Sequence, residues 1–372
     1  MMRIVIDGRP LVKRPTGIGT FTIDAIKSFC NYLPNWEIVL ALPDELHPEV
    51  DDLPLDKITL VIEKLPFKTK RFLWMQLKLP FIARKYKADI LWSTNSYLPL
   101  LRFKSYKTMI TIHDVVWKEY NKTMENRIIS FFTSWFIDNT IKKADYIWYN
   151  SFYTKRSVEK YYPTLVNKST VVGDSCNNRF KKINVTYQTR QEIYKEYNIQ
   201  TGYVLFVGSL EPRKNLSFLI RIMPEIYRRT SLKLLVVGAK GWKNNEISNI
   251  INSPSFNKSS VVFAGYVSNE LLVKLYNTAH CYISTAINEG FGMPQLEAMA
   301  CGCPVITANN SAMTEVAKGR GILVDGWDEQ TWIDIICDTV TNNELLKSMR
   351  NPDISEYSWK QIIMNVDKYL RS

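Results

Sequence analysis

Histidine and paired cysteines are scarce in this sequence. Only three of its 372 residues are histidine and six are cysteine, and no CxxC or Cys/His spacing typical of a metal site occurs. Cys301 and Cys303 are close enough together to suggest a metal, but no second ligand pair accompanies them. We therefore expect no metal site and interpret the cysteines as reduced thiols of the core.

Long apolar runs are also missing. No segment approaches the ~20 apolar residues that span a bilayer, and the opening MMRIVIDGRP enters a strand pattern without the layout of a signal peptide. These features predict a cytoplasmic protein. The length of 372 residues predicts two domains, since one domain takes roughly 150 residues.

The charge is unevenly distributed. The net charge is +12, and residues 1–180 carry 27 basic against 18 acidic side chains. The densest stretch is residues 64–87, KLPFKTKRFLWMQLKLPFIARKYK, where basic residues mix with aromatic ones and no acidic residue occurs. Such a segment suits a surface that lies on anionic lipid or one that follows nucleic-acid phosphates. A buried amphipathic helix with a solvated basic face would also explain it.

Short apolar runs alternate with helical patterns along the chain, which predicts an α/β fold of parallel sheets covered on both faces. Two series of runs predict two Rossmann-like, doubly wound domains. The polar segment near residues 180–200 separates an N-terminal domain, residues 1–185, from a C-terminal domain, residues 186–355, and residues 356–372 form a final amphipathic helix. The runs are RIVIDG, WEIVLAL, ITLVIE, ADILWST, KTMITIHD, ADYIWYNS and STVVGD, then YVLFVGS, LKLLVVG, SVVFAGY, HCYISTA, PVITAN and GILVD.

The residues that follow the strands are the candidates for a site, because open α/β sheets bind ligands at the carboxyl ends of their strands. The run KTMITIHD ends in His113, the only histidine at a strand terminus. Taken alone, such a histidine more often makes a structural hydrogen bond. After the first run, Gly17 and Gly19 flank Ile18, which is too short for a GxGxxG dinucleotide motif.

The run YVLFVGS ends in Gly208 and Ser209 and leads to Arg213 and Lys214, which we expect at the start of the next helix. Adjacent cations there are unfavourable for the helix dipole unless an anion lies over them. Arginine offers a forked donor and lysine a point charge. The pair therefore predicts a bound phosphate or diphosphate.

The run HCYISTA leads to EGFGMPQLE, residues 289–297. Its glycines allow close approach of the backbone to a ligand, and Pro294 suits the first helical position, whose N–H groups attract an anion. The two carboxylates, Glu289 and Glu297, would repel a phosphate unless they are directed at something else.

This combination resembles the retaining family-4 glycosyltransferases, which have the GT-B architecture of two Rossmann-like domains facing across a cleft. The most specific element is the E-x7-E pair within NEGFGMPQLEAMACGCPVI. TGIG, the HD at residues 113 and 114, NSFYTKRSV, VGSLEPRKNL and a closing SW support it in the same order along the chain. The EPRKN version is similar to a subgroup of bacterial O-antigen and capsule assembly that includes mannosyl and rhamnosyl transfer. The family's final helix crosses back toward the N-domain.

The resemblance implies transfer of a sugar from a GDP- or UDP-sugar to a hydroxyl of a glycan acceptor, expected to be lipid-linked, in polysaccharide or lipopolysaccharide biosynthesis. The configuration is retained, and no metal or cofactor is required. It assigns catalysis to His113, Glu289, Arg213 and Lys214. The cations hold the donor diphosphate, Glu289 approaches the transferred sugar, and the acceptor lies by the first glycine loop. The donor- and acceptor-binding residues are Glu297, which accepts from the ribose, with Gly290, Phe291, Gly292, Met293, Gly208, Ser209, Gly17 and Gly19.

The sequence departs from the family pattern at one position, and other functions are also open. Many relatives carry an arginine where this chain has Ser209, which leaves Arg213 and Lys214 as the main diphosphate cations. The resemblance also favours peripheral binding of residues 64–87 to the inner face of the cytoplasmic membrane. The alternatives are a catalytically silent homologue that serves as a partner subunit, a nucleic-acid-binding protein and a nucleotide-dependent oxidoreductase. The intact glutamate pair argues against the first, the lack of a nucleic-acid motif against the second, and the missing GxGxxG against the third.

Overall fold

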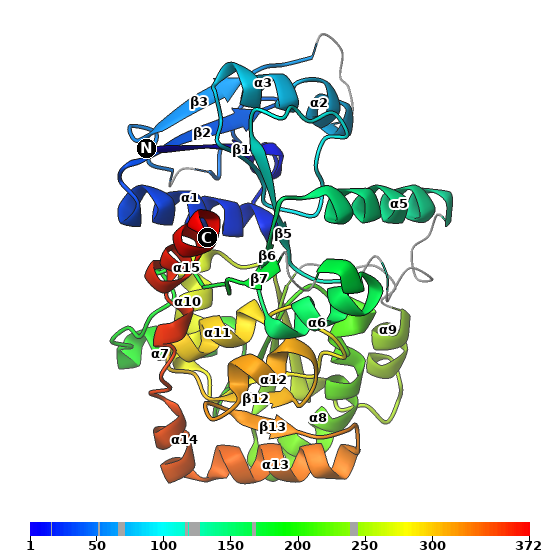
Figure 1. Ribbon diagram of the computed structural model, residues 1–372. Coiled ribbons are helices and arrows are strands. Elements are labelled where there is room, and N and C mark those ends of the chain that lie inside the picture. Colours follow the sequence, from blue (N-terminus) through cyan, green and yellow to red (C-terminus); the bar gives the residue numbers. More distant parts are fainter. Residues whose placement is uncertain are drawn as a thin grey trace. The chain divides into compact units, whose positions relative to one another are not determined.

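The computed structural model describes residues 1–15, 17–50, 53–65, 71–115, 118, 127–165, 169–238 and 245–372. The chain forms two compact units, Met1–Asp174 with Tyr357–Ser372, and Ser175–Glu356 (Figure 1). The polar segment of residues 180–200 thus lies within the second unit, and the end of the chain lies within the first.

The first unit contains a seven-stranded sheet in the order β3-β2-β1-β4-β5-β6-β7, with every pair of neighbours parallel. The chain turns from one half of the sheet to the other between β1 and β4. The strands are β1 (Met2–Asp7), β2 (Trp36–Leu42), β3 (Ile58–Ile62), β4 (Ile90–Ser93), β5 (Lys107–Ile112), β6 (Tyr146–Tyr149) and β7 (Ser169–Val171).

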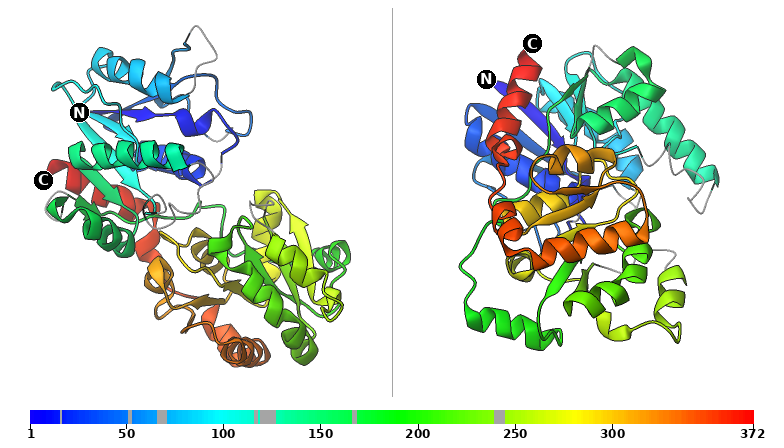
Figure 2. Two further views of the ribbon diagram at one scale, coloured as in Figure 1. Left: turned by 90° about the vertical axis from the view of Figure 1, so that its right-hand side faces the viewer. Right: turned by 90° about the horizontal axis from the view of Figure 1, so that it is seen from below.

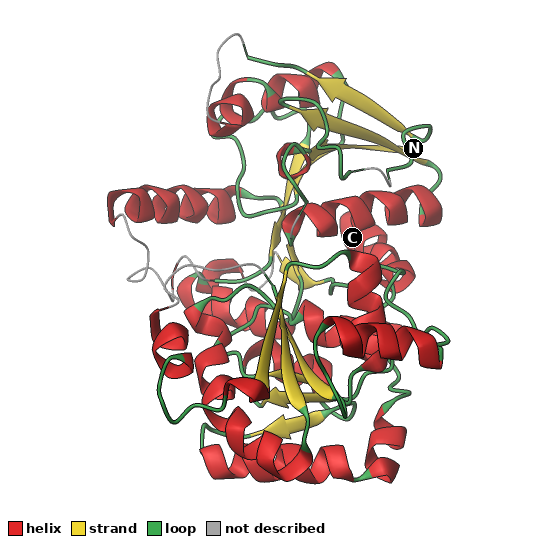
Figure 3. Ribbon diagram, turned by 180° about the vertical axis from the view of Figure 1, so that it is seen from behind, coloured by secondary structure: helices red, strands yellow, loops and turns green. Residues whose placement is uncertain are grey.

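Helices cover both faces of this sheet (Figure 3). On one face, α1 (Ile18–Tyr32) lies beside the last helix, α15 (Trp359–Arg371) (Figure 2). Trp92 stacks on Trp148 at 5.3 Å in the core that these helices cover. The return of the final helix to the first unit is thereby confirmed. The other face carries α2 (Arg71–Leu77), α3 (Leu79–Lys85), α5 (Arg127–Lys143) and α6 (Phe152–Tyr161). The short 3-10 turn Arg9–Leu11 (η1) packs on the α1 side, and Pro163–Leu165 (η3) packs on the α6 side.

The second unit contains a six-stranded parallel sheet in the order β10-β9-β8-β11-β12-β13, so its switch point lies between β8 and β11. The strands are nearly continuously apolar because both faces are covered. They are β8 (Tyr203–Val207), β9 (Lys233–Val237), β10 (Val261–Gly265), β11 (Tyr282–Ser284), β12 (Val305–Ala308) and β13 (Ile322–Val324).

The core of the second unit lies mainly between its sheet and the helices α8 (Leu216–Thr230), α9 (Asn245–Ile251) and α13 (Glu329–Thr341). On the opposite face the Tyr203 hydroxyl donates to the Leu275 carbonyl of α10 (Asn269–Thr278) at 2.8 Å. The remaining elements are α7 (Tyr187–Glu196), α11 (Met293–Ala300), α12 (Ser311–Ala317) and α14 (Asn343–Met349), with the turns η4 (Pro212–Lys214), η5 (Lys258–Ser260) and η6 (Ser355–Tyr357).

All thirteen apolar runs predicted as strands are strands, and both sheets are parallel, so the predicted fold class is confirmed. Within the described residues, no helix is both long and apolar enough to cross a bilayer. The six cysteines are buried, and none forms a disulfide with another described residue.

Candidate active site

Two loops at the switch point of the second sheet carry most of the predicted site. Strands β8 and β11 are neighbours, and the chain leaves β8 through Gly208 and leaves β11 through Thr285. Ligands of open α/β sheets bind outside the carboxyl ends of the strands at such a point, where adjacent loops diverge. The sequence motifs VGSLEPRKN and NEGFGMPQLE are therefore brought to one edge by the strand order.

Direct contacts hold these two loops together. The Ile287 N–H donates to the Arg213 carbonyl at 2.7 Å, and the Thr285 hydroxyl donates to the Asn215 carbonyl at 3.0 Å. Arg213 and Lys214 do not begin the next helix, as the sequence had suggested, but end the 3-10 turn η4. Asn215, in the left-handed conformation at φ 51°, separates that turn from α8 because the chain must reverse there.

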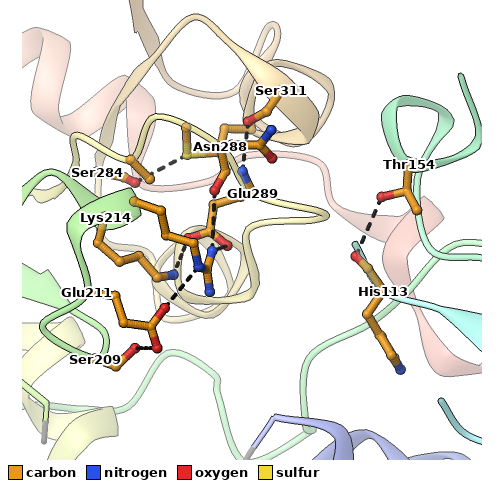
Figure 4. A network of polar contacts seen from close by, with 12 residues as sticks. His113, Thr154, Ser209, Glu211, Lys214, Ser284, Asn288, Glu289 and Ser311 are labelled. Atoms are coloured by element: carbon orange, nitrogen blue, oxygen red, sulfur yellow. Dashed lines mark hydrogen bonds and ion pairs between the residues drawn. The ribbon is translucent and has the colours of Figure 1, made fainter. Parts of the chain in front are cut away.

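The carboxylate of Glu289 lies between the two cations (Figure 4). Its Oε2 accepts a hydrogen bond from Nη1 of Arg213 at 2.8 Å, and its Oε1 pairs with Nζ of Lys214. The side chains of Glu289 and Lys214 are each only 12% exposed. Such charge-assisted contacts are strong when shielded from water. The first glutamate is thus neutralised by the residues that were predicted to bind phosphate.

The ionisation of Glu289 follows from this pairing. Burial alone would raise the pKa of the carboxyl, but Lys214 and then Arg213 outweigh it, so the pKa of Glu289 lies below its usual value. The carboxylate is therefore ionised at neutral pH and accepts hydrogen bonds only.

A second carboxylate, Glu211, holds Arg213 from the other side. Its Oε2 accepts from Nε of Arg213 at 3.0 Å, and its Oε1 accepts from the Ser209 hydroxyl at 2.8 Å (Figure 4). Ser209 thus orients an acid beside the cations, where many relatives have a further cation. The four charged side chains, Arg213, Lys214, Glu211 and Glu289, sum to zero. Glu211 was missed because an acid in a phosphate loop has no obvious role in the sequence.

The start of α11 has the expected glycine and proline, but the proline lies one position later in the helix than predicted. Gly292 caps the helix at φ 94°, a conformation open to glycine, and Pro294 occupies the second helical position rather than the first. The carboxylate of Glu297, in the second turn, accepts a 3.0 Å hydrogen bond from the buried Tyr276 hydroxyl. Gly290 and Phe291 are buried in the loop, and Met293 begins the helix.

The backbone of Glu289 is held by residues that the sequence did not reveal. Its N–H donates to the Ser311 hydroxyl at 3.2 Å, and its carbonyl accepts from the Ala312 N–H at 3.3 Å. Ser311 follows β12 and has φ 52°. The cluster ANNSA after a strand was the only available signal, and it indicates no more than a turn.

His113 belongs to the first unit and follows β5. Its Nε2 lies 2.9 Å from the Thr94 carbonyl, and its own carbonyl accepts from Asn150 at 2.9 Å and from Thr154 at 3.5 Å (Figure 4). Because a carbonyl only accepts, Nε2 carries a proton. Burial lowers the pKa of His113, so the neutral ring presents Nδ1 as an acceptor.

The remaining predicted residues are glycines of the two units. Gly17 caps α1 and Gly19 is buried in its first turn, in the first unit, and Gly208 donates its N–H to the Val237 carbonyl at 2.9 Å in the second. The basic segment is partly described: Lys68 and Lys70 lie outside the described residues, and α2 and α3 follow them. Among the residues that the structure describes, no group of three or more His, Cys, Asp or Glu side chains is placed to hold a metal.

Known proteins resemble this chain in sequence and in fold. Residues 189–353 match the family model described as "Glycosyl transferases group 1". The chain is 23% identical over 378 residues to O-antigen chain mannosyltransferase B of Escherichia coli, covering 97% of this chain and 93% of that protein. Among solved structures it resembles sucrose-phosphate synthase of Thermosynechococcus elongatus, with a TM-score of 0.75, 17% identity and coverage of 100% and 98% of the two chains. It also resembles HepE of Anabaena in complex with UDP and glucose, with a TM-score of 0.71, 14% identity and coverage of 100% and 99%.

The parallel sheets of both units and the likeness to these structures show the GT-B fold class. Residues 189–353, which contain the Glu289 cluster, are the part of the chain that matches the glycosyl transferases group 1.

Proposed function

We propose that this protein is a retaining, metal-independent glycosyltransferase that moves a sugar from a nucleotide-sugar donor to a glycan hydroxyl. The observation that carries the proposal is the pairing of Glu289 with both Arg213 and Lys214 at the switch point of the second sheet. The arrangement supplies two cations for a diphosphate and an acceptor carboxylate beside them.

The leaving nucleoside diphosphate is the group that these cations serve. Negative charge grows on the diphosphate as the glycosidic bond breaks, and preorganised cations stabilise it more than water does. Arg213 and Lys214 are held by a short turn and by backbone contacts, so little reorganisation of their main chain is needed. Arg213 and Lys214 thus stabilise the charge of the leaving diphosphate, as a divalent metal does in metal-dependent enzymes.

Donor binding changes the partner of the cations. A diphosphate carries more charge than one carboxylate, so it draws Arg213 and Lys214 away from Glu289. The carboxylate, still held at its backbone by Ser311, then accepts hydrogen bonds from hydroxyls of the transferred sugar. Glu297 accepts from the ribose in the same way, with Tyr276 fixing its carboxylate. His113 offers Nδ1 to a further ligand hydroxyl.

Mannose is the first sugar to test, and a lipid-linked glycan of a surface polysaccharide or lipopolysaccharide is the first acceptor. The support is the E. coli relative, whose name is that of an O-antigen chain mannosyltransferase. The UDP complex of the fold relative HepE supports a nucleoside diphosphate as the leaving group.

A thermal-shift panel of UDP-, GDP-, ADP- and dTDP-sugars tests the proposal. A donor at 100 times its dissociation constant stabilises the folded protein by about 2.7 kcal/mol. We expect one base to raise the Tm strongly, GDP-mannose being the first candidate, and to do so in the presence of EDTA. If no nucleotide-sugar of the panel raised the Tm, the donor site would be ruled out. The anomeric configuration of the product, read by NMR, tests retention.

Peripheral membrane binding through residues 64–87 is part of the proposal. Each lysine or arginine near anionic lipid contributes about 1 kcal/mol. Arg71 begins α2, and the exposed apolar side chains Leu77 and Phe81 lie on α2 and α3. Charge reversal of Lys68, Lys70 and Arg71 should abolish flotation with anionic liposomes. Unchanged flotation would show that this segment does not dock.

A further inference from the structure

A second concentration of positive charge lies in the first unit, whereas the Glu289 cluster belongs to the second. A cavity of about 450 Å³ is formed at the amino end of β5 and the last turn of α5. Since β5 has six residues at about 3.3 Å each, this cavity lies roughly 20 Å from His113, which follows the other end of the strand. Its polar lining residues include Arg102, Lys104, Tyr106, Lys107, Lys143 and Asp145.

The only carboxylate of the lining is already engaged. Asp145 Oδ2 accepts from the N–H and the hydroxyl of Thr108, both at 2.8 Å, and its Oδ1 lies 3.5 Å from Nζ of Lys107. Within the described part of the chain, Arg102, Lys104 and Lys143 have no carboxylate within ion-pair distance. The three cations at this cavity therefore repel one another, and Asp145 attracts Arg102 from beyond ion-pair distance.

Tyr106 adds an uncharged donor to these cations. The residue is 6% exposed, and its buried hydroxyl donates no hydrogen bond to the residues that the structure describes. A buried hydroxyl without a partner is unfavourable, and a ligand oxygen would satisfy it. Lys143 alone would be explained by the dipole of α5, whose last turn it occupies, but that explanation covers neither Arg102 nor the tyrosine.

Exposed apolar side chains border the cavity. Phe103, which lines it, packs edge-on against Phe81 of α3 at 5.4 Å, and the guanidinium of Arg84 lies 4.8 Å from the centre of the Phe103 ring. Phe81 is 51% exposed. Leu100 and Leu101, which precede Arg102 in the sequence, are exposed as well. Cations beside exposed aromatic and aliphatic groups suit the boundary between lipid headgroups and acyl chains.

We propose that this Arg102 cavity binds the phosphate of an anionic lipid headgroup, while the apolar side chains around Phe81 enter the lipid interface. Arg102, Lys104 and Lys143 neutralise the phosphate, and the Tyr106 hydroxyl donates to one of its oxygens. The site gives the proposed membrane association a defined phosphate contact and shares no residue with the donor site.

The test uses flotation of the full chain with three kinds of vesicle: phosphatidylcholine alone, phosphatidylcholine with phosphatidylglycerol, and phosphatidylcholine with a carboxylate lipid of equal surface charge. The R102Q/K143Q double variant should bind the phosphatidylglycerol vesicles at least tenfold more weakly. The matched control is K57Q/K160Q, which removes the same charge from two exposed lysines outside the cavity and should change binding less than threefold. Equal loss in both double variants would overturn the site in favour of general charge attraction.

Tyr106→Phe separates phosphate recognition from charge, because it keeps every cation. It should weaken binding to the phosphatidylglycerol vesicles several-fold and leave binding to the carboxylate vesicles unchanged. If Tyr106→Phe still preferred phosphatidylglycerol vesicles over carboxylate vesicles as strongly as the wild type does, the role of the hydroxyl would be overturned. Glycerol 1-phosphate in solution should compete only weakly; efficient competition together with no vesicle binding would show that the ligand is a soluble phosphate rather than a lipid.

Each variant is first checked for its nucleotide-sugar thermal shift. The cavity and the donor site lie in different units, so a retained shift shows a folded protein with an intact donor site. If R102Q/K143Q keeps its donor shift and binds the phosphatidylglycerol vesicles as the wild type does, only the lipid proposal is overturned. A missing donor shift in the wild type bears on the glycosyltransferase proposal alone.

Discussion

Glu289 and Arg213 stand 76 positions apart in the sequence, yet Nη1 of the arginine donates to Oε2 of the glutamate at 2.8 Å. Lys214 pairs with the other oxygen of the same carboxylate. The apparent conflict between a phosphate loop and an acid on it is thus resolved by direct pairing. In the proposed function, donor phosphate competes with Glu289 for one pair of cations.

Glu289→Ala and Lys214→Ala should each lower turnover at least about a hundredfold at saturating donor, the scale of losing one preorganised electrostatic group. Glu225→Ala is the matched control, because among the described residues Glu225 pairs with exposed cations of its own helix, α8, and its loss should leave turnover unchanged. Near-wild-type turnover of either site variant, measured in a sugar-transfer assay, would contradict the assigned roles.

Glu211→Gln should tighten the binding of a nucleoside diphosphate. The substitution removes a negative charge that contacts Arg213 at 3.0 Å and so reduces repulsion of the ligand. It also keeps a side chain of the same shape that can still accept from Ser209. Calorimetric titration with the diphosphate of the preferred base gives the dissociation constant. Weaker binding would mean that Glu211 acts chiefly by orienting Arg213.

His113 should make the protein less stable as the pH falls below about 6.5. Burial lowers the pKa of His113 in the folded state, so the unfolded chain binds more protons in the window below 6.5 and unfolding becomes more favourable there. Urea unfolding at pH 7.5 and 5.5 should show a smaller loss for His113→Gln than for the wild type. His280 has a pKa shifted in the same direction by burial, so the difference between the two proteins isolates His113. An equal loss of stability in the two proteins would show that His113 does not cause the pH dependence.

Gly238→Ala should destabilise the second unit and weaken donor binding. Gly238 has φ 152°, and a Cβ there would lie 1.9 Å from the carbonyl oxygen of Gly208, at the head of the loop that carries the cations. Displacing that oxygen would move the loop. Gly326→Ala is the control, because Gly326 also has a positive φ, 67°, but open space around its Cβ, and should cost only about 1–2 kcal/mol. Comparable losses of Tm in the two variants would contradict the steric account.

The predicted strands were correct because their apolar, β-branched runs are too short and too continuous for anything but buried parallel strands. The ends of β8 and β11 could likewise be read from the residues that follow them. The 3-10 turn at Arg213 and Lys214 could not be foreseen, since its reversal depends on Asn215 and on contacts from the neighbouring loop. Ser311, Glu211 and Tyr276 were missed because a supporting hydrogen bond has no fixed spacing in the sequence.

The sequence by itself determined the two series of strands, the order of the motifs and the residue types at the strand ends, because these follow from hydrophobic pattern and local chemistry. The pairing of Glu289 with Arg213 and Lys214 was decided only by the tertiary structure, since the order of strands in the sheet makes β8 and β11 neighbours across 74 intervening residues (208–281). The charged residues of a motif are known from the sequence. Which residues neutralise them depends on which strands are neighbours, because the contacts that stabilise a buried charge are made across the sheet.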